Sequence, residues 1–248
     1  ILKVAERNGL ATGIVVACNL THATPAAYIA NQPNRNMYEE IAADYLKTDV
    51  DVIIGGGRKN FAERADGRNL LNELEAKNYK VITNLNDLKN ITSGKLAALV
   101  YEEHNPPMPE RGNMLPDATS TAINILKNNK KGFFLMVEGS QIDWAAHDND
   151  AERIIAETLD FDKAVGSALD FAAKDGNTLV IVTADHETGG MTLTNGNIKS
   201  KQSIASFSTK NHSGVPVAVF AFGPGAELFG GFSENISFKP KIEQLLRI

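Results

Sequence analysis

Residues 138–150, EGSQIDWAAHDND, place acidic side chains and a histidine directly after an apolar run. That run, GFFLMV at positions 132–137, is typical of a buried strand. Carboxylates and imidazoles are costly to hold near an interior unless they are paired or bind a metal. Asp143 and His147 are four residues apart, so on a helical turn they share one face and could bind one ion.

Two further segments combine apolar runs with residues of these types. TLVIVTADHETGG, residues 178–190, brings Asp185 and His186 after a buried run, and KNHSG, residues 210–214, places His212 just before the run PVAVFAFG. A single histidine is more often a hydrogen-bonded structural residue than a metal ligand. Several such segments with partner carboxylates together favour metal binding at one edge of a sheet.

A ligand set of nitrogen and oxygen atoms without thiolates suits zinc. Asp143, His147 and His212 would leave one position open for water or substrate, and Asp185 with His186 would begin a second site. Two neighbouring cations that hold the attacking and leaving oxygens are typical of phosphoryl-transfer enzymes. These residues therefore indicate a two-metal site for phosphoryl transfer.

A phosphoryl group also needs a fork of hydrogen-bond donors, which arginine supplies best. The candidate is Arg35 in THATPAAYIANQPNRNMYEE, although an isolated arginine is more often only a surface residue. The glycine-rich stretch IIGGGRKNF, residues 53–61, lacks the lysine and hydroxyl ending of a P-loop. We interpret it as a turn at a strand end, not as a phosphate cradle.

The elements that must position these residues alternate along the chain, which predicts an α/β fold with a doubly wound, mostly parallel central sheet and helices on both faces. Most of the expected strands are continuous apolar runs, as in parallel strands that are covered on both sides. We expect strands at residues 12–17, 51–56, 79–83, 95–101, 132–139, 178–185 and 216–223. We expect helices at residues 36–47, 69–78, 117–129 and 150–174, and the end of a helix before the first strand.

Composition is consistent with one globular α/β domain over residues 1–248, with a polar loop or small insertion at about 190–212. The chain is 43% hydrophobic and 22% charged, and its net charge of −5 argues against a nucleic-acid or anionic membrane surface. No apolar run is long enough to span a bilayer. The single Cys18 excludes an internal disulfide and a cysteine-rich zinc site, and we expect it to be buried.

Four segments taken together resemble the bacterial alkaline phosphatases: VEGSQIDWAAHDND, TADHETGG, KNHSGVPVAVFAFGPGA and THATPAAYIANQPNR. Their order and spacing agree with that family along essentially the whole chain. The resemblance implies that Asp143, His147 and His212 hold a first zinc ion. It implies that Asp185 and His186 are two of the ligands of a second zinc ion.

The resemblance also implies a magnesium ion held by Glu138 and Thr24, and a phosphoryl group held by Arg35. Two positions depart from the best-known form of the pattern. His22 stands where some relatives have an aspartate beside the magnesium, and Trp144 stands where they have lysine or histidine near the phosphate. This pair resembles a bacterial subgroup and bears on the identity of the third metal. Trp144 is either an aromatic wall of the cleft or a direct substrate contact.

The family's nucleophilic serine, and an aspartate shared by the second zinc and the magnesium, lie upstream of the region matched here. Ser140 has no matching role. We therefore expect these 248 residues to be a C-terminal portion that is inactive alone, with incomplete second-zinc and magnesium sites, and we expect the missing segment to add strands to the sheet. Asp148 and Asp150 are expected to be solvated or to cap a helix.

For the complete protein the resemblance implies hydrolysis of small phosphomonoesters through a phosphoserine. It also implies a homodimer that is periplasmic or secreted. Two alternatives remain open. One is a phosphodiesterase, phosphonate hydrolase, sulfatase or mutase on the same scaffold, against which Arg35, Glu138 and Thr24 argue. The other is a zinc-binding fragment or inactive paralogue without catalysis.

Overall fold

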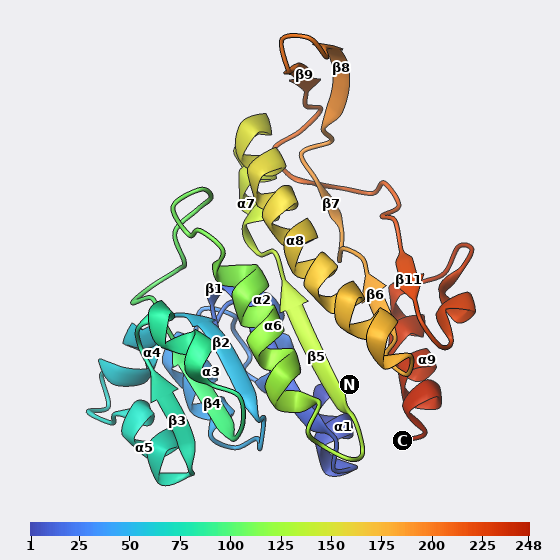
Figure 1. Ribbon diagram of the computed structural model, residues 1–248. Coiled ribbons are helices and arrows are strands. Elements are labelled where there is room, and N and C mark those ends of the chain that lie inside the picture. The colour runs from blue at the N-terminus through green and yellow to red at the C-terminus, as the bar shows by residue number, and fades with distance from the viewer.

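The computed structural model describes all residues from 1 to 248, and a five-stranded parallel sheet with the order β3-β4-β2-β1-β5 lies at its centre (Figure 1). Every neighbouring pair in this sheet is parallel. All nine residues of β1 are buried, which agrees with the continuous apolar run in its sequence. The strands are β1 (Ala11–Asn19), β2 (Val52–Gly56), β3 (Tyr79–Ile82), β4 (Lys95–Leu99) and β5 (Phe133–Glu138).

Helices cover both faces of the sheet, so the predicted fold class is confirmed. Successive residues of β1 point to opposite faces: Ile14 and Val16 belong to one hydrophobic cluster, and Val15 belongs to the other. The first cluster includes residues of α1, α2, α3, α4 and α5, and the second includes residues of α6, α8 and η1. The helical bounds are α1 (Leu2–Arg7), α2 (Ala23–Ile29), α3 (Tyr38–Tyr45), α4 (Arg58–Ala62), α5 (Leu70–Ala76), α6 (Met114–Leu126), α7 (Gln141–His147), α8 (Ala151–Asp175), α9 (Phe238–Leu246), η1 (Leu85–Asn90), η2 (Ala226–Phe229) and η3 (Asn235–Ser237).

The last two expected strands do not join the parallel sheet. The run at 178–185 forms only β6 (Val180–Val182), and the run at 216–223 forms only β11 (Phe220–Phe222). These two strands pair with each other in antiparallel orientation, and neither pairs with β5. An apolar run indicates burial but does not specify the neighbouring strand, so the sequence predicted these two strands without predicting how they pair. One edge of β5 and one edge of β6 therefore have no strand beside them.

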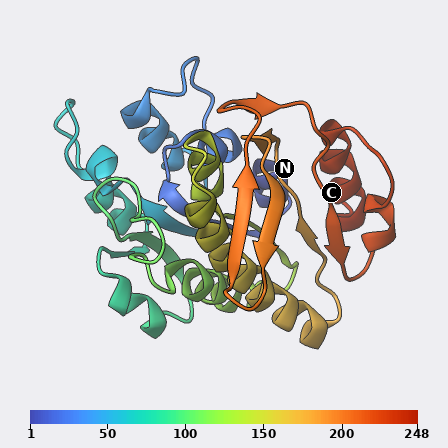
Figure 2. The same ribbon diagram turned by 90° about the horizontal axis from the view of Figure 1, so that it is seen from above.

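Residues 190–212 are dominated by an antiparallel hairpin of β8 (Thr192–Asn197) and β9 (Gln202–Ser206), which stands away from the body of the molecule (Figure 1). At its base, β7 (Glu187–Thr188) pairs with β10 (His212–Ser213). The C-terminal elements from β11 to α9 lie on the opposite side of the molecule from α4 and α5 (Figures 1 and 2). No helix combines the length and apolar character that a membrane crossing requires.

A buried ionic cluster joins the loop before α6 to α8. The Arg111 guanidinium donates to Glu157 at 2.5 Å and to Asp160 at 2.8 Å, and all three side chains are fully buried. Glu157 also accepts the backbone N–H of Met108 at 2.9 Å. Removing one member of such a cluster leaves the others charged and unpaired in a low-dielectric interior.

We expect Arg111→Met to lower the free energy of unfolding by about 3–5 kcal/mol, because Glu157 and Asp160 would lose their only cationic partner. Denaturant unfolding followed by circular dichroism measures this change. The matched control is Arg68→Met, which breaks the exposed pair with Glu73 and should have a much smaller effect. Equal losses in the two variants would contradict the role given to the buried cluster.

Candidate metal centre

The centre is built at the carboxyl end of β5, where α7 begins after a link of two residues. This helix carries Asp143, Trp144 and His147 at one edge of the sheet. The β7–β10 pair brings a separate part of the chain to the same place, with His212 opposite Thr188.

Close approach of the two parts depends on a glycine. Gly189 has a φ of +87°, and a Cβ atom there would lie 2.8 Å from the carbonyl oxygen of Ala146 in α7. A residue with a side chain at this position would be strained and would push the turn away from the helix. One of the two glycines after His186 is therefore needed to bring the turn against α7.

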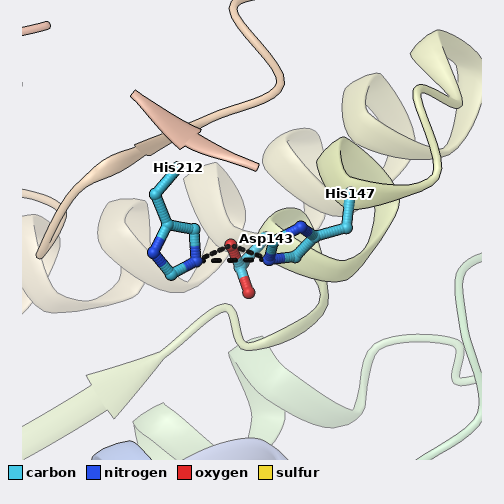
Figure 3. A group of neighbouring side chains, drawn as sticks. All are labelled: Asp143, His147 and His212. Atoms are coloured by element: carbon cyan, nitrogen blue, oxygen red, sulfur yellow. Dashed lines mark hydrogen bonds and ion pairs between the residues drawn. The ribbon is translucent and has the colours of Figure 1, made fainter. Parts of the chain in front are cut away.

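Asp143, His147 and His212 converge, as Figure 3 shows, with one ligand atom of each lying within 4.8 Å of the others. The Nε2 atoms of His147 and His212 are 3.2 Å apart. The Oδ1 atom of Asp143 lies 3.5 Å from the first of these nitrogens and 3.8 Å from the second. Ligand atoms about 2.0–2.1 Å from a tetrahedral zinc ion lie roughly 3.3–3.4 Å apart, so the three residues fit such an ion.

The tautomer of His147 is consistent with a cation at this position. Its Nδ1 lies 2.6 Å from the carbonyl oxygen of Lys210, which can only accept, so Nδ1 carries a proton. In the neutral ring, Nε2 then presents a lone pair toward His212 and Asp143. A metal-bound histidine commonly donates its second ring nitrogen to a carbonyl in this way.

Thr188, which sequence reasoning missed, connects the two proposed halves of the centre. Its hydroxyl donates to Oδ1 of Asp143 at 2.6 Å and lies 3.2 Å from Nδ1 of His186. Because the Thr188 hydroxyl donates its proton to the carboxylate, its oxygen accepts from Nδ1–H of His186. In the neutral ring, Nε2 of His186 then carries a lone pair and no proton. A small hydroxyl residue between a histidine and two glycines carries no signal of this role in the sequence.

Asp185 and His186 lie together beside the first group. Nε2 of His186 is 3.2 Å from Oδ2 of Asp185, and the His186 ring stacks on the His212 ring with centroids 3.6 Å apart. The two predicted sites are therefore adjacent. The side chain of Asp185 is 75% exposed, so its carboxylate faces solvent on the side away from His186.

Glu138 is a half-buried carboxylate that forms no salt bridge. Burial raises its pKa, and the Ser140, Thr24 and Cys18 side chains oppose that shift by hydrogen bonding to the charged form. Ser140 donates to Oε2 at 2.6 Å, and the buried thiol of Cys18 lies 3.6 Å from the same oxygen. A half-buried carboxylate that has no cationic side-chain partner and lies beside the hydroxyls of Ser140 and Thr24 fits an oxygen-binding cation such as magnesium.

The remaining predicted residues, Arg35, His22 and Trp144, lie together at one corner of the centre. Nη2 of Arg35 is 3.5 Å from Nε2 of His22, and the His22 and Trp144 rings meet edge to face with centroids 5.3 Å apart. Burial, together with neighbouring Arg35 and His104, lowers the pKa of His22 to about 4. His22 is therefore neutral at neutral pH.

Two smaller expectations are also settled by the structure. The glycine-rich turn is no phosphate cradle, because the backbone N–H groups of residues 57, 58 and 59 donate to the carbonyls of Glu103, Tyr101 and Glu102. Asp150 caps α8 by accepting the N–H of Arg153 at 3.0 Å, as predicted.

Comparison with known proteins places these features in one family. The family model described as alkaline phosphatase matches residues 1–206. Alkaline phosphatase 4 of Bacillus subtilis is 43% identical over 202 aligned positions, covering 78% of this chain and 43% of that protein. The alkaline phosphatase of Escherichia coli is 30% identical over 304 aligned positions, covering 95% of this chain and 64% of that protein. This chain thus spans well under half of the Bacillus relative.

The fold is also found in solved structures. The alkaline phosphatase of the Antarctic bacterium TAB5 superimposes with a TM-score of 0.93 and 43% identity, covering 100% of this chain and 75% of that one. A variant of that enzyme, similar at the same TM-score of 0.93, is described with Mg bound in its M3 site. The family model matches most of this chain, and the chain shares its fold with the TAB5 enzyme. The chain therefore belongs to the alkaline phosphatase family.

Proposed function

We propose that the complete protein is a metal-dependent phosphomonoesterase that acts through a phosphoserine. The observation that carries this proposal is the convergence of Asp143, His147 and His212, whose ligand atoms lie within 4.8 Å of one another. Asp185 and His186 lie directly beside them. Two adjacent sets of nitrogen and oxygen donors suit a pair of zinc ions, the usual device for in-line phosphoryl transfer.

The residues of this chain bind and orient the reacting groups. Zinc held by these donors would stabilise negative charge on the attacking and leaving oxygens. Arg35 would bind non-bridging oxygens of the phosphoryl group through two N–H groups. Since His22 is neutral, Arg35 is the positively charged side chain among Arg35, His22 and Trp144. Glu138 and Thr24 would hold the magnesium ion, and Trp144 is the aromatic wall or a substrate contact.

The nucleophile is proposed to come from an upstream segment. A serine of that segment would attack phosphorus as the alcohol leaves, and water would then cleave the phosphoserine to release inorganic phosphate. An aspartate of the same segment would complete the second zinc site and the magnesium site. The proposal is supported by the fact that this chain covers only 43% of the Bacillus relative.

The free strand edges also support an additional segment. β5 pairs only with β1, and β6 pairs only with β11. Most residues of both strands are only partly buried although their sequences are strongly apolar. We propose that a strand of the upstream segment lies between them and joins the two sheets, because unpaired apolar strand edges favour strand addition.

The substrates are proposed to be small phosphomonoesters. The complete protein is proposed to be a homodimer that is periplasmic or secreted. Exposed Leu193, Ile198 and Ile204 on or beside the β8–β9 hairpin support a contact with a second subunit. The location is supported by the family alone. A phosphodiesterase or sulfatase on this scaffold, and a non-catalytic zinc-binding fragment, are the outcomes that the following experiments would separate.

We expect Asp143→Asn to weaken zinc binding by at least roughly 100-fold. Losing a direct ligand should reduce the affinity for zinc more than losing a residue that only orients a ligand. Thr188→Val removes the hydroxyl donor to Asp143 and should weaken binding by about 10- to 100-fold. Asp148→Asn, on the solvent-exposed end of the same helix, is the control and should bind normally. Calorimetric titration of the 248-residue chain with zinc measures all three. Unchanged binding in Asp143→Asn would contradict the ligand assignment.

We expect the full-length protein to hydrolyse a chromogenic phosphomonoester, to lose this activity on chelation and to recover it with zinc and magnesium. Turnover of a matched phosphodiester or sulfate ester should be far slower. A phosphodiester offers fewer non-bridging oxygens to Arg35 and the metal ions, and a sulfate ester carries less negative charge than a phosphomonoester dianion. The 248-residue chain should be inactive while still binding zinc. Preferential diester or sulfate turnover would replace the proposed reaction, and no turnover in the full-length protein would leave a zinc-binding protein.

We expect the backbone amides of β5 that are not paired with β1 to exchange at least roughly tenfold more slowly in the full-length protein than in this chain alone. An added strand would accept hydrogen bonds from these amides. Hydrogen exchange followed by mass spectrometry or NMR measures the difference, and the fully buried β2 serves as the control, with similar protection in both. Equal exchange of β5 in the two proteins would argue against an inserted strand.

A further inference from the structure

His104 is the one histidine that lies away from the strand ends in the sequence, but the structure brings it to the corner that contains Arg35. Its ring meets the Trp144 ring edge to face with centroids 4.6 Å apart. It meets the His22 ring in the same way at 5.6 Å. The three rings therefore contact one another in pairs, since His22 and Trp144 are also in contact.

The backbone on the N-terminal side of His104 is tied to the first turn of α4. The N–H groups of Gly57, Arg58 and Lys59 donate to the carbonyls of the three residues that precede His104, at 2.8–3.1 Å. Gly56 makes room for this contact, because a Cβ atom there would lie 2.1 Å from the carbonyl oxygen of Glu103. The loop is thus held against the end of β2 and cannot carry His104 away without breaking these bonds.

The backbone on the C-terminal side is tied to β1 and to α7, the helix that carries Asp143 and Trp144. Buried Asn105 donates to the carbonyl of Val16 in β1 at 3.3 Å. Gln141, the first residue of α7, donates to the carbonyl of Asn105 at 2.7 Å and to that of Ala17 at 3.0 Å. His104 therefore sits between two anchored stretches, and one of them is joined to the helix that carries Asp143 and Trp144.

The ring itself is oriented by a hydrogen bond. The backbone N–H of Asn19, at the end of β1, donates to Nδ1 of His104 at 3.1 Å. Nδ1 then has no proton, so the neutral ring carries its proton on Nε2. This bond fixes the direction in which the ring faces Trp144 and His22.

Arg35 depends on this group of rings for its position. Its contact with Nε2 of His22, at 3.5 Å, is its only polar side-chain contact in the structure, and it forms no ion pair. His22 has no side-chain cap bond to α2 and is packed by the Trp144 and His104 rings. A flexible arginine loses less entropy on binding a ligand when its surroundings already hold it in place.

We propose that His104 is a positioning residue for phosphoryl binding, which holds the His22 and Trp144 rings edge to face so that Arg35 is presented to the substrate. The inference rests on the proposed function for what Arg35 binds, but the contact with Trp144 can be tested without it. Two features of His104 carry the role: the ring, which packs on Trp144 and His22, and Nδ1, which accepts from Asn19.

Two substitutions separate these features. His104→Phe keeps an aromatic ring and removes the acceptor, and His104→Asn keeps an acceptor near Nδ1 and removes the ring. His104→Ala removes both. The matched control is Glu102→Ala, on the same loop, whose exposed side chain makes only a 4.0 Å contact with Arg58.

The first measurement uses the fluorescence of Trp144, which is the only tryptophan of the 248-residue chain. We expect His104→Ala and His104→Asn to increase quenching by acrylamide, because the indole loses its covering ring. His104→Phe should stay closer to the wild type, and Glu102→Ala should match it. Identical quenching in all variants would overturn the proposal whatever the enzyme's activity.

The second measurement is the binding of inorganic phosphate to the zinc-loaded chain and to the full-length protein. We expect His104→Ala to weaken phosphate binding roughly 3- to 10-fold, the worth of one aromatic contact, while zinc content stays unchanged. In the full-length protein the same change should raise KM for a phosphomonoester more than it lowers kcat. A loss of zinc, or a fall in kcat with KM unchanged, would overturn the positioning role.

Failure of the proposed function would look different. A wild-type protein that binds neither zinc nor phosphate would contradict the phosphatase assignment, and the fluorescence comparison would still decide whether His104 orders Trp144. Normal zinc and phosphate binding in the wild type, together with normal phosphate affinity in His104→Ala, would leave the phosphatase assignment standing and overturn the inference about His104.

Discussion

Two imidazole nitrogens and a carboxylate oxygen that face one another repel unless a proton or a cation lies between them. Here the Nε2 atoms of His147 and His212 are 3.2 Å apart, and Asp143 faces both. The proton of His147 is directed to a backbone carbonyl at 2.6 Å, away from the cluster. The C-terminal half of the chain holds these three groups together, with their ligand atoms within 4.8 Å of one another.

The protein holds them with backbone contacts that are largely independent of the charged groups. The β7–β10 pair places His212 opposite Thr188, and Gly189 lets that turn approach α7. On the other side, Gln141 ties the start of α7 to β1 and to the loop after His104. Because these contacts do not involve a substrate, they would need little reorganisation when the proposed phosphoryl group binds.

Electrostatics differ between the two ends of this centre. Glu138 is half-buried and has no cationic side-chain partner, which favours a bound cation at this end. Arg35 is instead beside a histidine that is kept neutral by burial, which leaves the guanidinium charge available to an anion. The short helix α7 contributes to both proposed sites, with Asp143 and His147 among the candidate metal ligands and Trp144 against the His22 ring.

The sequence by itself determined the fold class, the main helices and which residue types gather at the strand ends. Continuous apolar runs and helical periodicity indicate burial and local structure directly. Asp143 and His147 could be paired on spacing alone, because residues four apart share a helical face. Four motifs in order were enough to identify the family.

Only the tertiary structure decided which segments lie side by side. It paired β6 with β11, which the sequence could not predict because apolar runs do not specify their neighbours. It brought Thr188 to Asp143 and His104 to Trp144, contacts that join residues 45 and 40 positions apart in the sequence. Neither residue carries a local signal, since a hydroxyl or an imidazole gains its role from the groups that the folded chain places around it.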